Sequence, residues 1–276
     1  MKISCYNKIL YFVLVVSLSC PGLLRAADDG LSGLLAGDWR PPQEVERDRY
    51  RHPLETLHFF GLFPEAKVVE LWPGRGWYTA LLAPYLRDHG QLTVASFGDE
   101  AEPPFRARLH REYLQRLAAR PEIYGKVRVV ILNPPQEVDL GYRGEADFVL
   151  TFRNLHNWIM DGTLDEVFAA AFRALRPGGV FGVVEHRAPE GGDIRTWVRR
   201  GYVPEAYVIE QAQAAGFELQ ERSELNANPV DSKDHPEGVW TLPPTLKLGD
   251  KDRERYQAIG ESDRMTLRFV KPLSPP

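Results

Sequence analysis

Short apolar runs alternate with amphipathic stretches of helical spacing from Lys67 to the end of this 276-residue chain. Continuous apolar strands separated by helices are typical of a parallel β-sheet that is covered on both faces. The polar, Pro-rich stretch 226–262 interrupts the alternation, so the strand after it has no helix before it and should pair antiparallel with its predecessor. The pattern predicts an α/β fold with a seven-stranded, mostly parallel sheet, helices on both faces and an antiparallel last strand.

The boundaries of the expected elements come from these runs and from the Gly and Pro residues that end them. The expected strands are 68–72, 92–97, 127–132, 147–151, 180–185, 217–225 and 265–270. The expected helices are 79–87, 104–119, 163–175 and 204–215. We find no internal repeat and no second core. Residues 27–276 are therefore predicted to form a single domain, with a helical segment at 27–66 and a long loop at 226–262 before the last strand.

The first 26 residues have the three parts of a secretory signal peptide. Lys2 and Lys8 form the basic N-terminal part, the run 9–18 is apolar, and the small residues Ala26 and Ala27 flank the expected cleavage site. The run is shorter than the roughly 20 residues of a membrane-spanning helix. The prediction is a cleaved signal peptide, 1–26, on an exported protein, periplasmic or secreted, with no stable membrane span afterwards. An uncleaved anchor, a buried helix and a lipoprotein acylated at Cys20 are the alternatives.

Cleavage after Ala26 would leave a mature chain without cysteine, because Cys5 and Cys20 are the two that the sequence contains. Disulfides, thiol nucleophiles and Cys-ligated zinc are then excluded. The removed segment carries three basic residues and no acidic ones, so the net charge of −4 becomes −7. An acidic chain without a long basic run is a poor candidate for nucleic-acid binding, and no nucleic-acid partner is predicted.

The sharpest local motif is a strand, a glycine turn and a helix start at 68–79, with Glu70 on the strand and Gly74 and Gly76 in the turn. Glycine is required where a backbone turns tightly and approaches a ligand closely, and the first turn of an open α/β sheet borders the ligand crevice. The turn lacks the third glycine of a dinucleotide site and the Lys-Ser/Thr of a P-loop. A carboxylate facing a glycine turn suits a cationic ligand better than a pyrophosphate.

With this motif in view, the chain resembles the class I, Rossmann-like S-adenosylmethionine-dependent methyltransferases. More narrowly, it is similar to a group of exported bacterial proteins known only as predicted methyltransferases. The segments that carry the likeness are the glycine turn at 68–79, Arg-Ala-Leu-Arg-Pro-Gly-Gly at 173–179, and the segments 49–57, 151–158, 206–217 and 263–272. Together they cover nearly the whole mature chain.

The resemblance implies that S-adenosyl-L-methionine is the cofactor. Its methionine end would lie against Glu70, Gly74, Gly76 and Trp77, and Trp72 and Pro73 depart from the broader family, which often begins a Gly-x-Gly-x-Gly loop there. An acidic residue after the second strand usually binds the ribose, and Asp99 is the first candidate and Glu100 the second. Asn133, after the third strand, is a candidate contact for the adenine. An ordinary solvated loop acid is the alternative for both carboxylates.

Polar residues gather after the fourth strand, at the edge where this fold places the acceptor substrate. Asn154 and His156 are the candidate catalytic residues, with His156 as a general base because its unperturbed pKa lies near neutrality. The equally weighted alternative is that both side chains cap the next helix or satisfy buried carbonyls. Residues 185–187 form a second polar cluster at this edge. The spacing matches no recognised metal motif, so no metal is predicted.

Two functions follow from these residues. The first is methyl transfer from S-adenosylmethionine to a small-molecule acceptor, and the second is a non-catalytic exported binding protein that retains the methyltransferase fold. Glu70, the two turn glycines and the cluster of Asn154 and His156 favour the first. The second is favoured by the expected export, because S-adenosylmethionine is made in the cytoplasm and is charged. The sequence contains neither a nucleophile elbow nor a His-Glu-x-x-His motif, so no motif supports a hydrolase.

Overall fold

Seven strands form one sheet in this computed structural model, which describes residues 30–273; the predicted signal peptide, 1–26, lies outside the described residues. The strands are β1 (Lys67–Leu71), β2 (Gln91–Ser96), β3 (Arg128–Ile131), β4 (Ala146–Phe152), β5 (Leu175–His186), β6 (Glu218–Ser223) and β7 (Arg264–Val270). Their order across the sheet is β3-β2-β1-β4-β5-β7-β6. The seven expected strands are confirmed.

The first five strands pair in parallel, and the last strand reverses direction. β7 lies between β5 and β6 and pairs antiparallel with both, with Leu267 opposite Val183 on one side and opposite Arg222 on the other. The predicted antiparallel pairing of the last strand with its predecessor is confirmed. Its insertion between the two preceding strands leaves β6 as the edge strand on this side of the sheet.

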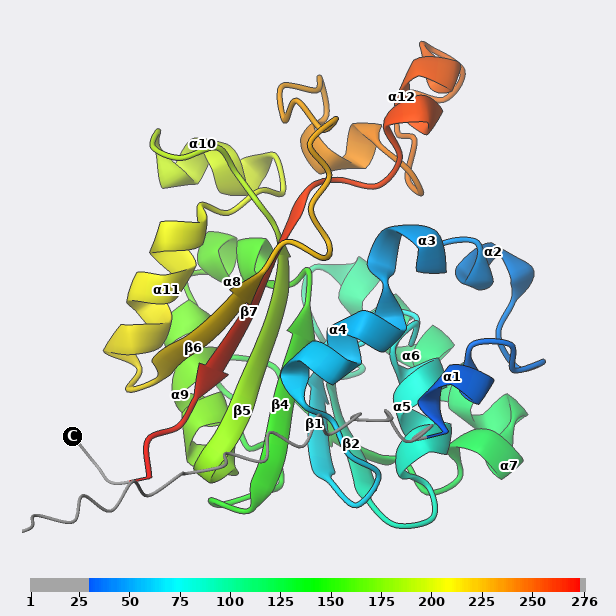
Figure 1. Ribbon diagram of the computed structural model, residues 1–276, viewed down its shortest axis with the longest axis vertical. Coiled ribbons are helices and arrows are strands. Elements are labelled where there is room, and N and C mark those ends of the chain that lie inside the picture. Colours follow the sequence, from blue (N-terminus) through cyan, green and yellow to red (C-terminus); the bar gives the residue numbers. More distant parts are fainter. Residues whose placement is uncertain (1–29, 274–276) are drawn as a thin grey trace, which may run out of the picture.

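Helices cover both faces of the sheet (Figure 1). They are α1 (Leu31–Leu34), α2 (Pro42–Val45), α3 (Asp48–Arg51), α4 (Pro53–Phe60), α5 (Thr79–Leu86), α6 (Pro104–Ala119), α7 (Pro121–Tyr124), α8 (Leu155–Asp161), α9 (Leu164–Ala174), α10 (Ile194–Arg199), α11 (Glu205–Ala214), α12 (Arg253–Ile259) and the 3-10 turn η1 (Gly238–Thr241). The four expected helices correspond to α5, α6, α9 and α11. In Figure 1 the segments around α3, α10 and α12 stand beyond the carboxyl ends of the parallel strands.

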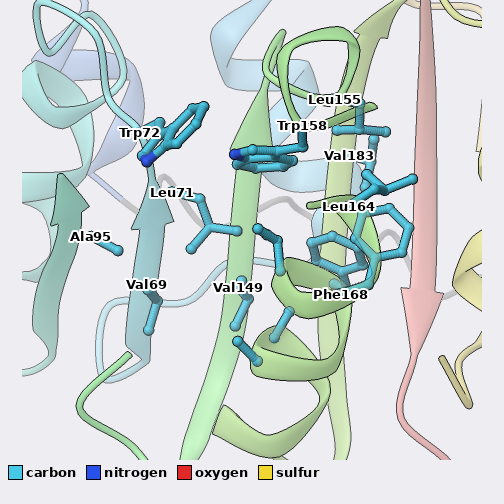
Figure 2. Close-up of a cluster of buried hydrophobic side chains, with 14 of the residues drawn as sticks. Val69, Leu71, Trp72, Ala95, Val149, Leu155, Trp158, Leu164, Phe168 and Val183 are labelled. Carbon is cyan, nitrogen blue, oxygen red and sulfur yellow. The ribbon is translucent and has the colours of Figure 1, made fainter. Parts of the chain in front are cut away.

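Alternate residues of β1 enter two separate apolar cores. Val69 and Leu71 pack toward α8 and α9 (Figure 2), whereas Val68 packs toward α4 and α5. Successive side chains of a strand point to opposite faces, so the apolar residues of β1 supply both cores. Glu70 lies on the face of the sheet that α5 covers, where it contacts Thr79. A buried carboxyl group among apolar side chains is unusual and marks Glu70 as a candidate functional residue.

The stretch 226–262 differs from the expected loop, because it contains η1 and, directly before β7, helix α12. The expectation that no helix precedes the last strand is therefore wrong. Polar contacts hold this segment: buried Asp231 accepts hydrogen bonds from the Tyr202 hydroxyl and from the backbone N–H of Asp263, and it pairs with His235. Apolar periodicity does not detect a segment that is fixed in this way.

Candidate functional site

A pocket of about 460 Å³ opens at the carboxyl edge of the sheet, where β1 and β4 lie side by side. The chain leaves these two strands in opposite directions, and open α/β sheets bind ligands at such a switch point. We call it the edge pocket. It is lined by Gln43, Glu44, Arg47, Pro73, Gly74, Arg75, Trp77, Leu109, Arg153, His186, Val239, Trp240, Pro243, Pro244, Thr245, Glu261 and Ser262.

Two larger hollows lie elsewhere on the molecule. One, of about 730 Å³, is lined by residues between Val138 and Gly144 together with α9, away from the glycine turn. The other, of about 940 Å³, lies beside β6 and α11. Only the edge pocket, among these three, is lined by the predicted turn, so it is the candidate site.

The turn after β1 has a left-handed backbone at Trp72 (φ 42°), Gly74 (φ 60°) and Gly76 (φ 82°). Gly74 lines the edge pocket, and a Cβ added there would meet no atom within 4 Å. A Cβ on Gly76 would lie 3.0 Å from the ring of Tyr113, so this glycine serves close packing instead. Of the two predicted glycines, Gly74 is the one that presents open backbone to a ligand.

Glu70 lies buried beneath this turn, where its Oε2 accepts a hydrogen bond of 2.6 Å from the hydroxyl of Thr79. Burial raises the pKa of Glu70 to about 7, and the Thr79 hydrogen bond opposes that rise only in part. A cationic group that approached through the turn would favour the ionised carboxylate. Glu70 does not line the pocket itself, so its effect on a ligand is electrostatic.

Trp72 fills the space between the ends of β1, β2 and β3. Its Nε1 donates a 2.9 Å hydrogen bond to the carbonyl oxygen of Leu132, and its ring centroid lies 4.5 Å from that of Phe97 and 5.2 Å from that of Trp158. Figure 2 shows the two indoles next to each other above the strand ends. The guanidinium of Arg106 covers the ring at 4.9 Å. The indole is almost fully buried and excludes any other group from this space.

The residues predicted to bind the ribose and the adenine lie outside the edge pocket. Asp99 and Glu100 are exposed, and Asp99 faces Arg111 at 3.9 Å. Asn133 pairs its backbone with Glu137 in a tight hairpin beyond β3. Ser96 and Phe97, at the end of β2, are the last buried residues before this turn, and the two acids that follow lie in solvent.

Asn154 and His156 are held in structural contacts. The Asn154 Nδ2 donates hydrogen bonds to the carbonyl oxygens of Leu71 and Trp72, which ties the end of β4 to the end of β1. His156 lies in the first turn of α8, where its Nδ1 is 3.2 Å from Oε1 of buried Glu185. Neither residue lines the edge pocket. The contacts of Asn154 match the alternative given for it, that its side chain satisfies buried carbonyls at the start of a helix.

His186, at the end of β5, reaches the pocket instead. Its Nδ1 is hydrogen-bonded to the hydroxyl of Ser262, and among residues 30–273 no partner binds its Nε2. Burial, followed by the charge of Arg153, lowers the pKa of His186 well below its usual value, so the imidazole is neutral at physiological pH. A neutral imidazole at a pocket wall can accept a hydrogen bond or a proton.

Arg153, which follows β4, is a pocket residue that sequence reasoning missed. The adjacent Asn154 and His156 were predicted from their polar side chains at the strand end, but the arginine between β4 and α8 is the one that lines the pocket.

Within the described part of the chain, no group of three His, Cys, Asp or Glu is placed to hold a metal ion. None of the helices in residues 30–273 is both long and apolar enough to cross a membrane.

Comparisons with known proteins identify the fold. No protein-family model matches the chain, and no curated protein matches its sequence. Solved structures do: a methyltransferase dependent on S-adenosylmethionine from Aquifex aeolicus is 15% identical with a TM-score of 0.52, over 71% of this chain and 90% of that one. Geranyl diphosphate methyltransferase in complex with S-adenosylmethionine is 16% identical with a TM-score of 0.52, over 87% and 94%.

The [4+2]-cyclase SpnF is a third similar structure, 17% identical with a TM-score of 0.55 over 89% of this chain and 94% of that one. The chain therefore has the Rossmann-like fold of the class I S-adenosylmethionine-dependent methyltransferases. Because one neighbour is named as a cyclase, the fold does not by itself specify the reaction.

The site fits S-adenosylmethionine at one end and not at the other. The open backbone at Gly74, with Glu70 beneath it, suits the cationic methionine end. The space expected for the nucleoside, between the ends of β2 and β3, is filled by the indole of Trp72. The cofactor and this indole cannot occupy that space together, so the nucleoside fits only where Trp72 has moved.

We predict that Glu70→Gln removes a pH dependence of stability. The folded protein holds the Glu70 proton up to about pH 7, whereas the unfolded chain releases it near its ordinary pKa of 4.5, so stability falls as pH rises through this window. Relative to the parent, the variant should gain about 3 kcal/mol in free energy of unfolding between pH 4 and pH 8. Urea unfolding at both pH values measures it; exposed Glu145→Gln is the control, and an equal pH profile for parent and variant contradicts the prediction.

We also predict that His156→Ala lowers the free energy of unfolding by about 1–3 kcal/mol, because Glu185 loses a buried hydrogen-bond partner. Ligand affinity at the edge pocket should stay unchanged. Thermal denaturation and calorimetry on the same samples test this, with exposed His89→Ala as the matched control. Unchanged stability together with lost turnover would instead restore His156 as a catalytic base.

Proposed function

We propose that this chain is an S-adenosylmethionine-dependent methyltransferase that acts on a small molecule. The observation that carries the proposal is the open turn at Gly74 above the buried carboxyl of Glu70, located at the switch point of the sheet. Solved neighbours with the same fold include a methyltransferase in complex with this cofactor. When bound, the cofactor supplies a methyl group that its sulfonium has already activated.

The protein's own residues then have to bind and orient the acceptor, which also has to lose a proton. His186 is proposed to orient the acceptor by accepting a hydrogen bond from its hydroxyl or amine, because its imidazole is neutral and its Nε2 is free of partners within residues 30–273. Its lowered pKa makes it a weak base, so the proton leaves to solvent or to a base on the acceptor itself. Trp77 and Trp240 form apolar walls that exclude water from the reacting groups. Asn154 and His156 keep the strand ends and α8 in place and act as positioning residues.

A non-catalytic binding protein is the second candidate, and the buried indole of Trp72 favours it. This side chain is 4% exposed and closes the space that a nucleoside needs. Opening that space breaks the hydrogen bond to Leu132 and the ring contacts with Phe97 and Trp158. A chain that never opens it would retain the fold and the edge pocket without using the cofactor.

Export is part of the same proposal, as the resemblance to the exported group and the pattern of residues 1–26 suggest. Mass spectrometry of the extracytoplasmic fraction should find a chain that begins at or near Ala27. A full-length chain confined to the cytoplasm would contradict export and would give the protein direct access to cytoplasmic S-adenosylmethionine.

The cofactor proposal is tested by Trp72→Gly. Glycine adopts the left-handed backbone of this position without strain and empties the indole space. We expect calorimetry to find that the parent binds S-adenosylmethionine and that the variant binds it about tenfold or more tightly, because no indole has to be displaced first. Trp197→Ala, a tryptophan outside the edge pocket, is the control and should bind as the parent does.

Three results are informative. Binding by the parent and tighter binding by Trp72→Gly support the methyltransferase. Binding by the folded variant alone, with none by the parent, favours the non-catalytic candidate. Binding by neither overturns the proposed cofactor. Circular dichroism and melting temperatures confirm that each variant is folded.

A further inference from the structure

Four arginines meet one carboxylate beside the edge pocket. Glu261 Oε1 accepts a hydrogen bond from Nε of Arg47 at 2.6 Å, and its Oε2 accepts from Nε of Arg51 and from Nη1 of Arg264, each at 3.1 Å. Arg153 is the fourth arginine, close enough that its charge acts on Glu261. Burial opposes the ionisation of Glu261, yet the surrounding arginines hold its pKa below the usual range. One carboxylate cannot neutralise four guanidinium groups.

Arg153 is the member of this cluster without a counter-ion. It lines the pocket, is half-buried, and makes no side-chain hydrogen bond or ion pair with any residue in the range 30–273. Its backbone is left-handed (φ 65°), a conformation unusual for a residue with a Cβ. Burial and the nearby charges of Arg51 and Arg47 lower the pKa of Arg153 well below its ordinary value. Strain and an unpaired charge coincide at this residue.

Further guanidinium nitrogens in the cluster lack partners. Nη2 of Arg47, Nη2 of Arg51 and Nε of Arg264 are buried without a hydrogen bond. Buried polar groups are almost always hydrogen-bonded, and guanidinium groups are particularly suited to bidentate contact with carboxylate and phosphate. The cluster thus contains more donors than its own acceptors can satisfy.

The neighbouring acids are already engaged. Glu44, which also lines the pocket, forms two hydrogen bonds with Arg116, at 2.6 and 2.9 Å. Asp263 pairs with Arg187 and Lys233. The hollow beside β6 offers a contrast, because there Arg187 is neutralised by Glu224 as well as by Asp263. The uncompensated positive charge at the edge pocket thus contrasts with the paired charges of this second hollow.

We propose that the edge pocket binds the anionic group, a carboxylate or phosphate, of a small molecule through Arg153 and Arg47. The anion site does not depend on methyl transfer, but its assignment to the acceptor substrate rests on the proposed function. The methionine carboxylate of the cofactor is the other source of the same chemistry.

The rest of the pocket wall indicates the body of this ligand. Trp77, Trp240 and Leu109 line it, and Pro243 and Pro244 add apolar surface. The volume of about 460 Å³ lies within the range of small-molecule sites. An organic acid or phosphate ester with a compact apolar or aromatic body matches a cationic end beside aromatic walls.

Calorimetry with phenyl phosphate and with benzoate, at ionic strength held constant with potassium chloride, tests the site. We expect the parent to bind at least one probe, Arg153→Gln to bind it at least about tenfold more weakly, and Arg153→Lys to lie between them. Arg108→Gln removes the same charge from the exposed face of α6 and should leave binding unchanged.

Stability separates binding from a structural role. Without ligand, Arg153→Gln should melt at the same temperature as the parent or higher, because it removes a repelled, unpaired charge. The probes should raise the melting temperature of the parent and not that of the variant. Equal probe binding by parent and Arg153→Gln, absence of binding by the parent, or a large loss of stability in the unliganded variant would each overturn the proposal.

A competition experiment distinguishes the two sources of the anion. If phenyl phosphate and S-adenosylmethionine bind the parent together, the anion belongs to the acceptor. If S-adenosylmethionine displaces phenyl phosphate, the arginines hold the cofactor's carboxylate and the acceptor assignment is overturned. If the probe binds and S-adenosylmethionine does not, the anion site stands and the methyltransferase proposal fails.

Discussion

The indole of Trp72 connects the carboxyl ends of four neighbouring strands. Trp72 follows β1, and its backbone N–H donates to the carbonyl oxygen of Ala95 in β2. Its Nε1 donates to the carbonyl oxygen of Leu132 beyond β3, and its ring packs on Phe97 after β2 and on Trp158 of the helix after β4. These contacts stabilise the left-handed backbone that the turn needs. In the ligand-free protein, this one side chain joins the strand ends that surround the glycine turn.

Conformational strain and unpaired charge are concentrated at this edge. Trp72 and Arg153 have left-handed backbones although both carry a Cβ, and they follow the two strands that border the switch point. Such outliers persist where the surrounding structure holds them, and they are common at functional sites. The arginine cluster adds an electrostatic cost in the ligand-free protein. A bound anion would offset that cost, so stability and ligand binding are coupled at the same residues.

Much of the fold could be predicted from the sequence, because β1 and its neighbours carry uninterrupted apolar runs with clear Gly and Pro ends. The glycine turn was also predictable, since its spacing is local. Beyond β5, the prediction depended on the stretch 226–262, which interrupts the alternation of strands and helices and so indicated an antiparallel last strand. The role of Asp99 stays a prediction, because an exposed acid after β2 is compatible both with ribose binding and with solvent, and the sequence does not distinguish the two.

The arginine cluster could not be predicted, because Arg47 and Glu261 are 214 residues apart and meet only in the folded chain. Local periodicity contains no information about such a pair. Trp72 offered a local signal, as a bulky residue at a position where the broader family has glycine. Its burial, however, became evident only with the strand ends assembled.

The charges at the edge also constrain how a ligand with two charges can lie. Glu70, beneath the turn, becomes fully ionised only above about pH 7, and a cation nearby shifts that equilibrium toward the ionised form. Arg153 and Arg47, across the pocket, favour an anion. A cationic group is therefore favoured near the turn and an anionic group near the arginines, whether one ligand or two supply them. Both the methyltransferase and the non-catalytic binding protein would have this arrangement of charges, because it comes from the chain's own residues. The two candidates differ in whether Trp72 moves to admit a nucleoside.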